Sequence, residues 1–80
     1  MERSELFAKV SQILTDYLRL GPGEIKESSH VVDDLGADSL ALVELGFKFM
    51  EAFGIGMLNP EGEIMVIGPL VDRIATLMKA

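Results

Sequence analysis

Apolar residues recur at intervals of three and four between residues 6 and 18, and this spacing constrains the fold more than any other feature. An α-helix completes a turn in about 3.6 residues, so such a series lies on one helical face. It predicts a helix that begins near Ser4, a suitable N-cap, and that Gly21-Pro22-Gly23 ends. The predicted apolar face consists of Leu6, Phe7, Val10, Ile13, Leu14, Tyr17 and Leu18.

Two further segments have helical patterns. One runs from about Ser39 to Phe53 with Gly54 as its C-cap, and the last begins at Pro69. The last helix is expected to bury Leu70, Val71, Ile74, Leu77 and Met78. Between them, the segment from Ile55 to Ile67 contains glycine and proline, which predicts turns with at most one short helix. We expect the apolar run Ile64–Ile67 to pack against the bundle as an extended segment or a single turn, because it has no partner strand. The expected fold is an all-α bundle of three to four helices.

A long loop, from about Gly21 to Asp38, joins the first two predicted helices. We expect Ile25, Val31, Val32 and Leu35 to attach it to the core. A loop of this length in so small a domain is usually functional or well anchored.

Size and charge limit the function. Eighty residues allow a single domain, residues 1–80, with little room for a buried active site. A net charge of −6 argues against a nucleic-acid partner and favours partners with basic patches. The chain has no cysteine, and we find neither a signal peptide nor a stretch able to span a bilayer. We expect a cytoplasmic monomer that does not insert into membranes.

Asp38 and Ser39 stand where the second helix begins. An aspartate N-cap accepts hydrogen bonds from free backbone N–H groups, and the first turn favours a bound phosphate. A serine hydroxyl in that turn is well suited to carry a phosphodiester. A nucleophilic serine enzyme would need a nearby base, yet His30 is the only histidine and no Gly-x-Ser-x-Gly elbow surrounds Ser39. His30 is most simply a surface or loop-packing residue.

Nearly the whole chain resembles the acyl carrier protein family, most strongly from Ser28 to Phe53. The resemblance is carried by Asp33-Asp34-Leu35-Gly36, Asp38-Ser39-Leu40, Glu44-Leu45 and Phe53-Gly54-Ile55. It implies a carrier without catalytic activity, on which a phosphopantetheinyl transferase attaches 4′-phosphopantetheine from coenzyme A to Ser39. The arm would carry an acyl group as a thioester to fatty acid, lipid or polyketide-type enzymes that have basic or apolar docking patches. The alternatives are an aminoacyl or peptidyl carrier and an unmodified helical interaction module.

The predicted second helix is apolar around most of its circumference. One stripe holds Leu40, Val43, Phe47 and Met50, another holds Leu42, Leu45, Phe49 and Phe53, and the pattern alone does not decide which is buried. Ala41, Met50 and Ala52 stand where the family often has acids, and Lys48 adds a positive charge. For partner recognition we predict Asp38, Leu40, Glu44 and Glu51. Candidates for lining an acyl pocket are Val43, Gly46, Phe47, Met50, Met57 and Met65. We read Asp33 and Asp34 as a solvated turn and predict no metal site.

Overall fold

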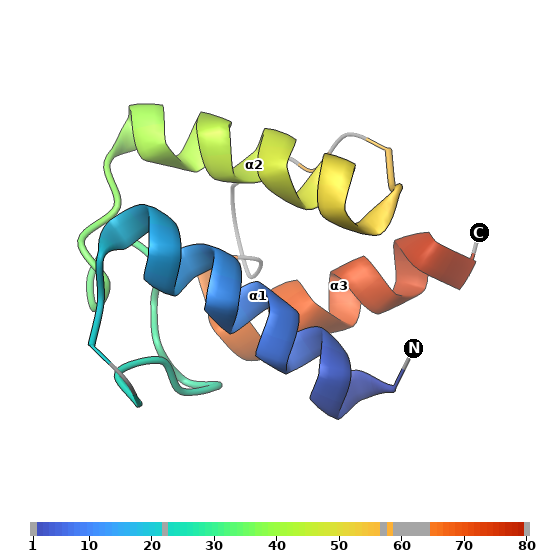
Figure 1. Cartoon of the computed structure of the whole chain (residues 1–80), viewed down its shortest axis with the longest axis horizontal. Helices are drawn as coiled ribbons and strands as arrows, with labels where there is room; N and C mark the ends of the chain where they lie inside the picture. The colour runs from blue at the N-terminus through green and yellow to red at the C-terminus, as the bar shows by residue number, and fades with distance from the viewer. Residues whose placement is uncertain (1, 22, 57, 59–64, 80) are drawn as a thin grey trace.

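The computed structural model describes residues 2–21, 23–56, 58 and 65–79, and these ranges contain three α-helices and no strand (Figure 1). They are α1 (Arg3–Leu18), α2 (Ser39–Phe53) and α3 (Ile67–Lys79). α1 packs against both of the other helices. The predicted all-α bundle with a long first loop is therefore confirmed. The question of a short helix between Gly56 and Gly68 falls mainly on residues outside the described ranges.

The ends of α2 agree with the prediction, and those of α1 do not. Asp38 is the N-cap of α2, and Gly54 closes it with φ 63°, in the left-handed region that glycine adopts without strain. α1 begins earlier than predicted, with Glu2 as N-cap, so Ser4 lies within the helix. It also ends before the Gly-Pro-Gly segment, at Arg19, which takes the left-handed conformation with φ 56° and donates its N–H to the Thr15 carbonyl.

α3 begins at Ile67, two residues before the predicted start at Pro69. The loop after α1 explains the difference, because its carbonyls accept hydrogen bonds from the first helical N–H groups. Ile67 N donates to Ser29 O at 3.0 Å and Gly68 N to Glu27 O at 2.8 Å. These groups have no partner within the helix itself. Pro69 follows without loss, since it has no N–H to satisfy.

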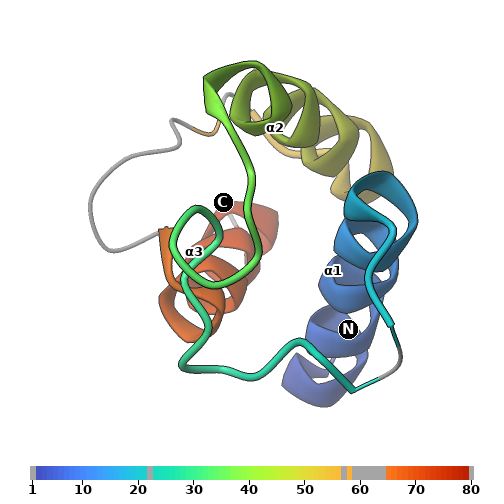
Figure 2. The same ribbon diagram turned by 90° about the vertical axis from the view of Figure 1, so that its left-hand side faces the viewer.

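The loop between α1 and α2 crosses the end of the bundle to reach the start of α3 and then returns to α2 (Figure 2). Val31 and Leu35 are buried in the core and the half-buried Ile25 packs against it, so these three attach the loop as predicted. Val32 is half-buried but lies outside the group of side chains packed against the core. An isolated antiparallel bridge joins His30 to Val66. The expectation that the Ile64–Ile67 run has no strand partner is therefore wrong at Val66, because a distant loop residue supplies one.

The core lies between the three helices and the loop. The buried faces are those predicted for α1 and α3, except that Met78 is exposed at the end of α3. No described helix is both long enough and apolar enough to cross a membrane. The side chains with no more than 4% exposure are Leu6, Val10, Leu14, Val31, Ala37, Leu45, Phe49, Ile67, Leu70, Val71 and Ile74.

Candidate functional site

Ser39 is the first residue of α2 and is exposed to solvent. Asp38 precedes it in an extended conformation, and its Oδ1 accepts a hydrogen bond from Ala41 N at 2.8 Å. The Asp38 carbonyl accepts from Leu42 N at 3.0 Å, which starts the helical ladder. The predicted N-cap is therefore confirmed. The Ser39 hydroxyl lies in a first turn whose N–H groups and helix dipole favour a negatively charged group.

α2 buries one of its two apolar stripes and exposes most of the other. Leu45, Phe49 and Phe53 face the core. Leu40 is 73% exposed, Val43 54% and Phe47 56%. Leu40, Val43 and Phe47 are three and four residues apart, so they form one surface, here called the apolar stripe, that starts beside Ser39. Exposed apolar area of this kind on a protein surface commonly marks an interaction site.

The predicted recognition residues lie on the outside of α2. Asp38, Leu40, Glu44 and Glu51 are all exposed. Glu44 is not free, because the Tyr17 hydroxyl of α1 donates a hydrogen bond to its Oε2. That bond, with burial and the negative charge of Glu44 as smaller causes, raises the pKa of Tyr17 above its usual value. Lys48 Nζ stands 5.6 Å from the centre of the Tyr17 ring. No local pattern in the sequence predicts this link between α1 and α2.

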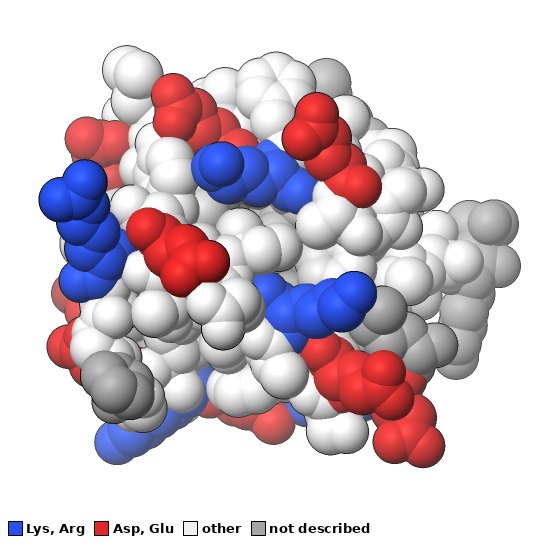
Figure 3. Space-filling view, in the orientation of Figure 1, with Lys and Arg blue, Asp and Glu red and all other residues white. Residues whose placement is uncertain are grey.

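Basic and acidic side chains alternate on the face shown in Figure 3, and neither sign forms a continuous patch there. The excess of acidic residues in the chain therefore does not produce a uniformly acidic surface on this side. Because the two signs are mixed, the charges on this face would do little to steer a partner by electrostatic attraction alone.

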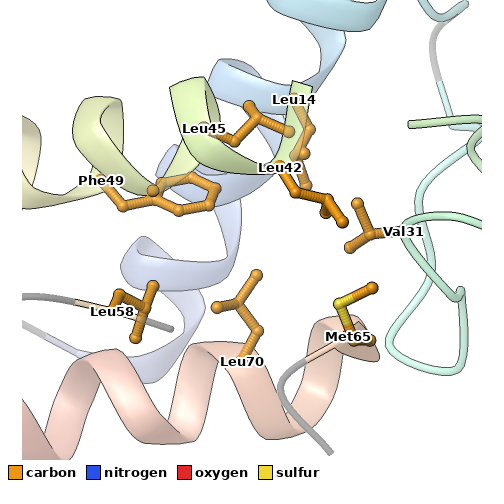
Figure 4. Close-up of a pocket in the computed structure, with 9 residues that line it drawn as sticks. Leu14, Val31, Leu42, Leu45, Phe49, Leu58, Met65 and Leu70 are labelled. Atoms are coloured by element: carbon orange, nitrogen blue, oxygen red, sulfur yellow. The ribbon is translucent and has the colours of Figure 1, made fainter. Parts of the chain in front are cut away.

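A small apolar cavity lies between the three helices and the loop (Figure 4). Its volume is about 20 Å³, close to the least that holds one water molecule. Leu42 is three residues beyond Ser39, so the cavity begins within one helical turn of the serine. An acyl chain would enter only if the lining side chains moved apart. The lining consists of Leu14, Val31, Leu42, Leu45, Gly46, Phe49, Leu58, Met65 and Leu70.

Only part of the predicted pocket group lies at this cavity. Gly46 and Met65 line it. Val43 and Phe47 were expected there, but they belong to the apolar stripe and lie on the opposite side of α2. Met50 is half-buried beside the core without lining the cavity, and Met57 lies outside the described residues. The leucines and Phe49 of the lining were not among the predicted pocket residues.

Comparison with known proteins gives concordant matches. Residues 8–58 match a family model described as "Phosphopantetheine attachment site". The chain is 37% identical to the acyl carrier protein of Thermotoga maritima, with 90% of each chain covered. It is 39% identical to that of Wolinella succinogenes, covering 89% of this chain and 95% of the relative. It is 43% identical to that of Clostridium acetobutylicum, covering 86% and 91%.

Proposed function

The chain belongs to the acyl carrier protein family, and we propose that Ser39 is the residue on which it carries its 4′-phosphopantetheine arm. A member of this family is a carrier, not a catalyst, and it works with a phosphopantetheinyl transferase and with enzymes that handle acyl groups. The observation that supports Ser39 is its place as an exposed first residue of α2, directly after the Asp38 cap and inside the matched segment.

The geometry around Ser39 fits a phosphodiester. In the transfer, the Ser39 hydroxyl oxygen forms a new P–O bond, the phosphoanhydride bond of coenzyme A breaks, the hydroxyl proton is released and the nucleotide part leaves. The product phosphate carries a negative charge at the N-terminus of α2, where the helix dipole stabilises it. When bound, the arm supplies a terminal thiol that holds an acyl group as a thioester. Tethering raises the effective concentration of that group at each partner enzyme.

We further propose that the cavity shelters part of the acyl chain between visits to partners. The side chains that line it are all apolar, and Met65 and Leu42 have side chains that can change rotamer to enlarge it. Gly46 contributes no side chain to the wall, which leaves space at the middle of α2. Met50 and Met57 are secondary candidates for contact with a longer chain.

Partner recognition is proposed to use Asp38, Leu40, Glu44 and Glu51 together with the apolar stripe. All are exposed on α2 or at its N-terminus. The apolar stripe makes docking less dependent on salt than docking through carboxylates alone. We propose that the chain acts as one domain, as a monomer in the cytoplasm.

Intact mass spectrometry tests the attachment site. The protein is incubated with coenzyme A, Mg²⁺ and a phosphopantetheinyl transferase of broad specificity. We expect the mass to rise by one phosphopantetheinyl group in the wild-type protein and in Ser28→Ala, a control that removes an exposed loop serine. Ser39→Ala should show no gain. A gain in Ser39→Ala, or none in the wild type, would overturn the assignment. Analysis of cargo on protein from the native cell then separates an acyl from an aminoacyl or peptidyl load.

A further inference from the structure

A single helical turn leads into the segment that presents Ser39. It follows His30, whose carbonyl accepts hydrogen bonds from Asp34 N at 2.9 Å and Leu35 N at 3.1 Å. Gly36 N then donates to Val32 O at 3.1 Å. Gly36 has φ 79°, a left-handed conformation that ends the turn and sends the chain toward Asp38. The turn therefore sets the path by which the backbone reaches Ser39.

The imidazole of His30 caps this turn. Its Nδ1 accepts hydrogen bonds from Val32 N and Asp33 N, both at 3.1 Å. In return, the Asp34 carboxylate accepts from His30 N at 2.6 Å. This reciprocal arrangement is similar to a capping box, with histidine in place of the usual serine or threonine and with the acidic residue four positions after the cap instead of three. Nδ1 can accept only when it bears no proton, so the cap requires a neutral imidazole with its hydrogen on Nε2.

The same residue connects the turn to the cavity. His30 pairs with Val66 in the antiparallel bridge, and the next residue, Val31, donates its N–H to Met65 O at 2.8 Å. Val31 and Met65 both line the cavity. Ala37, buried after the turn, donates its N–H to Val31 O at 3.1 Å. Loss of the His30 cap would therefore affect both the backbone segment that leads to Ser39 and the cavity wall formed by Val31 and Met65.

We propose that His30 is a positioning residue for the modification of Ser39, and that it acts only while its imidazole is neutral. This inference rests on the proposed attachment at Ser39. Histidine is the side chain whose charge normally changes between about pH 5 and 8. Protonation at Nδ1 removes both hydrogen bonds to the backbone amides, so the approach segment to Ser39 loses its cap.

The charges around His30 favour a new hydrogen bond from the protonated Nδ1 to a carboxylate, in place of the two bonds that it accepted. Among the described residues, the charged groups that face the ring are on its own loop. Asp33 Oδ2 lies 3.8 Å from Nδ1, and the Asp34 carboxylate holds the His30 N–H. From α3 and the residues just before it, the packed neighbours are the uncharged Val66 and Met65. A protonated Nδ1 would donate toward Asp33 instead of accepting from Val32 and Asp33 amides. The imidazole is partly exposed, so protons reach it from solvent.

NMR of the unmodified protein tests the cap directly. We expect the His30 ring to carry its proton on Nε2 at neutral pH, with Nδ1 unprotonated. The amide signals of Val32 and Asp33 should shift together with the titration of the ring. In His30→Ser, whose hydroxyl caps without titrating, those amide shifts should disappear. A proton on Nδ1 at neutral pH, or the same amide titration in His30→Ser, overturns the cap.

The rate of phosphopantetheinyl transfer tests the positioning. The ratio of kcat/KM for wild type to that for His30→Ser is measured across the range in which the ring titrates, so the transferase's own pH dependence cancels. We expect a ratio near one where the imidazole is neutral and a severalfold fall where it is charged. A flat ratio overturns the positioning role. Failure of the proposed attachment site has a different signature, namely no modification of Ser39 at any pH while the NMR results hold.

Discussion

Gly46 of α2 faces the main-chain carbonyl of Leu58: a β-carbon built on Gly46 would lie 3.4 Å from that oxygen. This is the limit of an ordinary contact, so a methyl group fits and a larger side chain must displace Leu58 or enter the cavity. Both residues line that cavity. A glycine inside a helix costs about 1 kcal/mol relative to alanine. The close approach of the Leu58 carbonyl to Gly46 is the packing feature that accompanies this cost.

Replacing Gly46 by leucine should impair storage of an acyl chain. The added side chain would occupy the cavity that a chain must enter, because the cavity holds only about 20 Å³ to begin with. We expect acylation to raise the melting temperature of the wild type and to raise that of Gly46→Leu much less. Val43→Leu, a control on the exposed side of α2, should keep the wild-type increase. Equal acyl-dependent stabilisation in wild type and Gly46→Leu would contradict the idea.

The two contributions of Asp38, as a cap and as a charge, can be separated. Asparagine caps a helix about as well as aspartate, whereas alanine costs about 1 kcal/mol. We therefore expect Asp38→Asn to keep the wild-type free energy of unfolding and Asp38→Ala to lose about 1 kcal/mol, both measured by urea denaturation. Phosphopantetheinyl transfer to Asp38→Asn should be slower than to wild type, because the partner loses a charge to recognise. If the asparagine variant is modified at the wild-type rate, the charge plays no part in recognition.

Local patterns in the sequence were enough to predict the helical bundle, the Asp38 N-cap and the Gly54 C-cap of α2. Each of these depends on neighbours within a few residues. The start of α3 was misplaced because it depends on the Ser29 and Glu27 carbonyls, far away in the chain. Tertiary hydrogen bonds to helix ends leave no trace in local propensity.

The same reasoning explains what was missed at the site. Both stripes of α2 are apolar, so periodicity could not tell which one faces the core, and Val43 and Phe47 were assigned to the wrong side. The Tyr17–Glu44 bond joins two helices. To predict this bond, one would have to know how α1 and α2 are rotated relative to each other. His30 had a local signal, the Asp34 four residues later, but histidine is an unusual cap.

Arg3 joins the start of α1 to the loop and α3. Its Nε lies 2.7 Å from Asp72 Oδ1 and its Nη2 lies 2.7 Å from Glu27 Oε1. The hydrogen bond from Arg3 lowers the pKa of Glu27. Because the folded-state pKa lies below the unfolded one, the stabilisation is present above the unfolded pKa and is lost as pH falls through the folded value.

Arg3→Gln should therefore be less stable than wild type at neutral pH, and the difference should shrink as the medium is acidified below the usual range of glutamate. Since all three side chains are largely exposed, the loss should be small and should shrink with added salt. Urea denaturation over a pH series measures it. Lys9→Gln, which removes a positive charge elsewhere on α1, should show no such pH dependence. A Lys9→Gln profile that matches Arg3→Gln would attribute the effect to net charge instead.

Phe47 should contribute to partner binding through apolar contact. Replacing it by serine removes the aromatic ring of a residue that is mostly exposed, so we expect the free energy of unfolding to change by no more than about 0.5 kcal/mol. The KM for phosphopantetheinyl transfer should rise about tenfold if the ring is buried by the transferase. That increase should persist at high salt, whereas the effect of Glu51→Gln should diminish. An unchanged KM in Phe47→Ser would exclude the distal part of the apolar stripe from this interface.

The phenol of Tyr17 should ionise at higher pH than an ordinary tyrosine. Its hydrogen bond to Glu44 raises the pKa, so the contribution to stability is present below the unfolded pKa and is lost as pH rises through the folded value. Tyr17 is the only tyrosine and the chain has no tryptophan, so tyrosinate absorbance reports this one group. We expect the midpoint in wild type to lie above that of an unperturbed tyrosine. Glu44→Gln should lower it, because the charge is gone, and Glu51→Gln should leave it unchanged. Identical titrations of wild type and Glu44→Gln would show that the bond does not persist in solution.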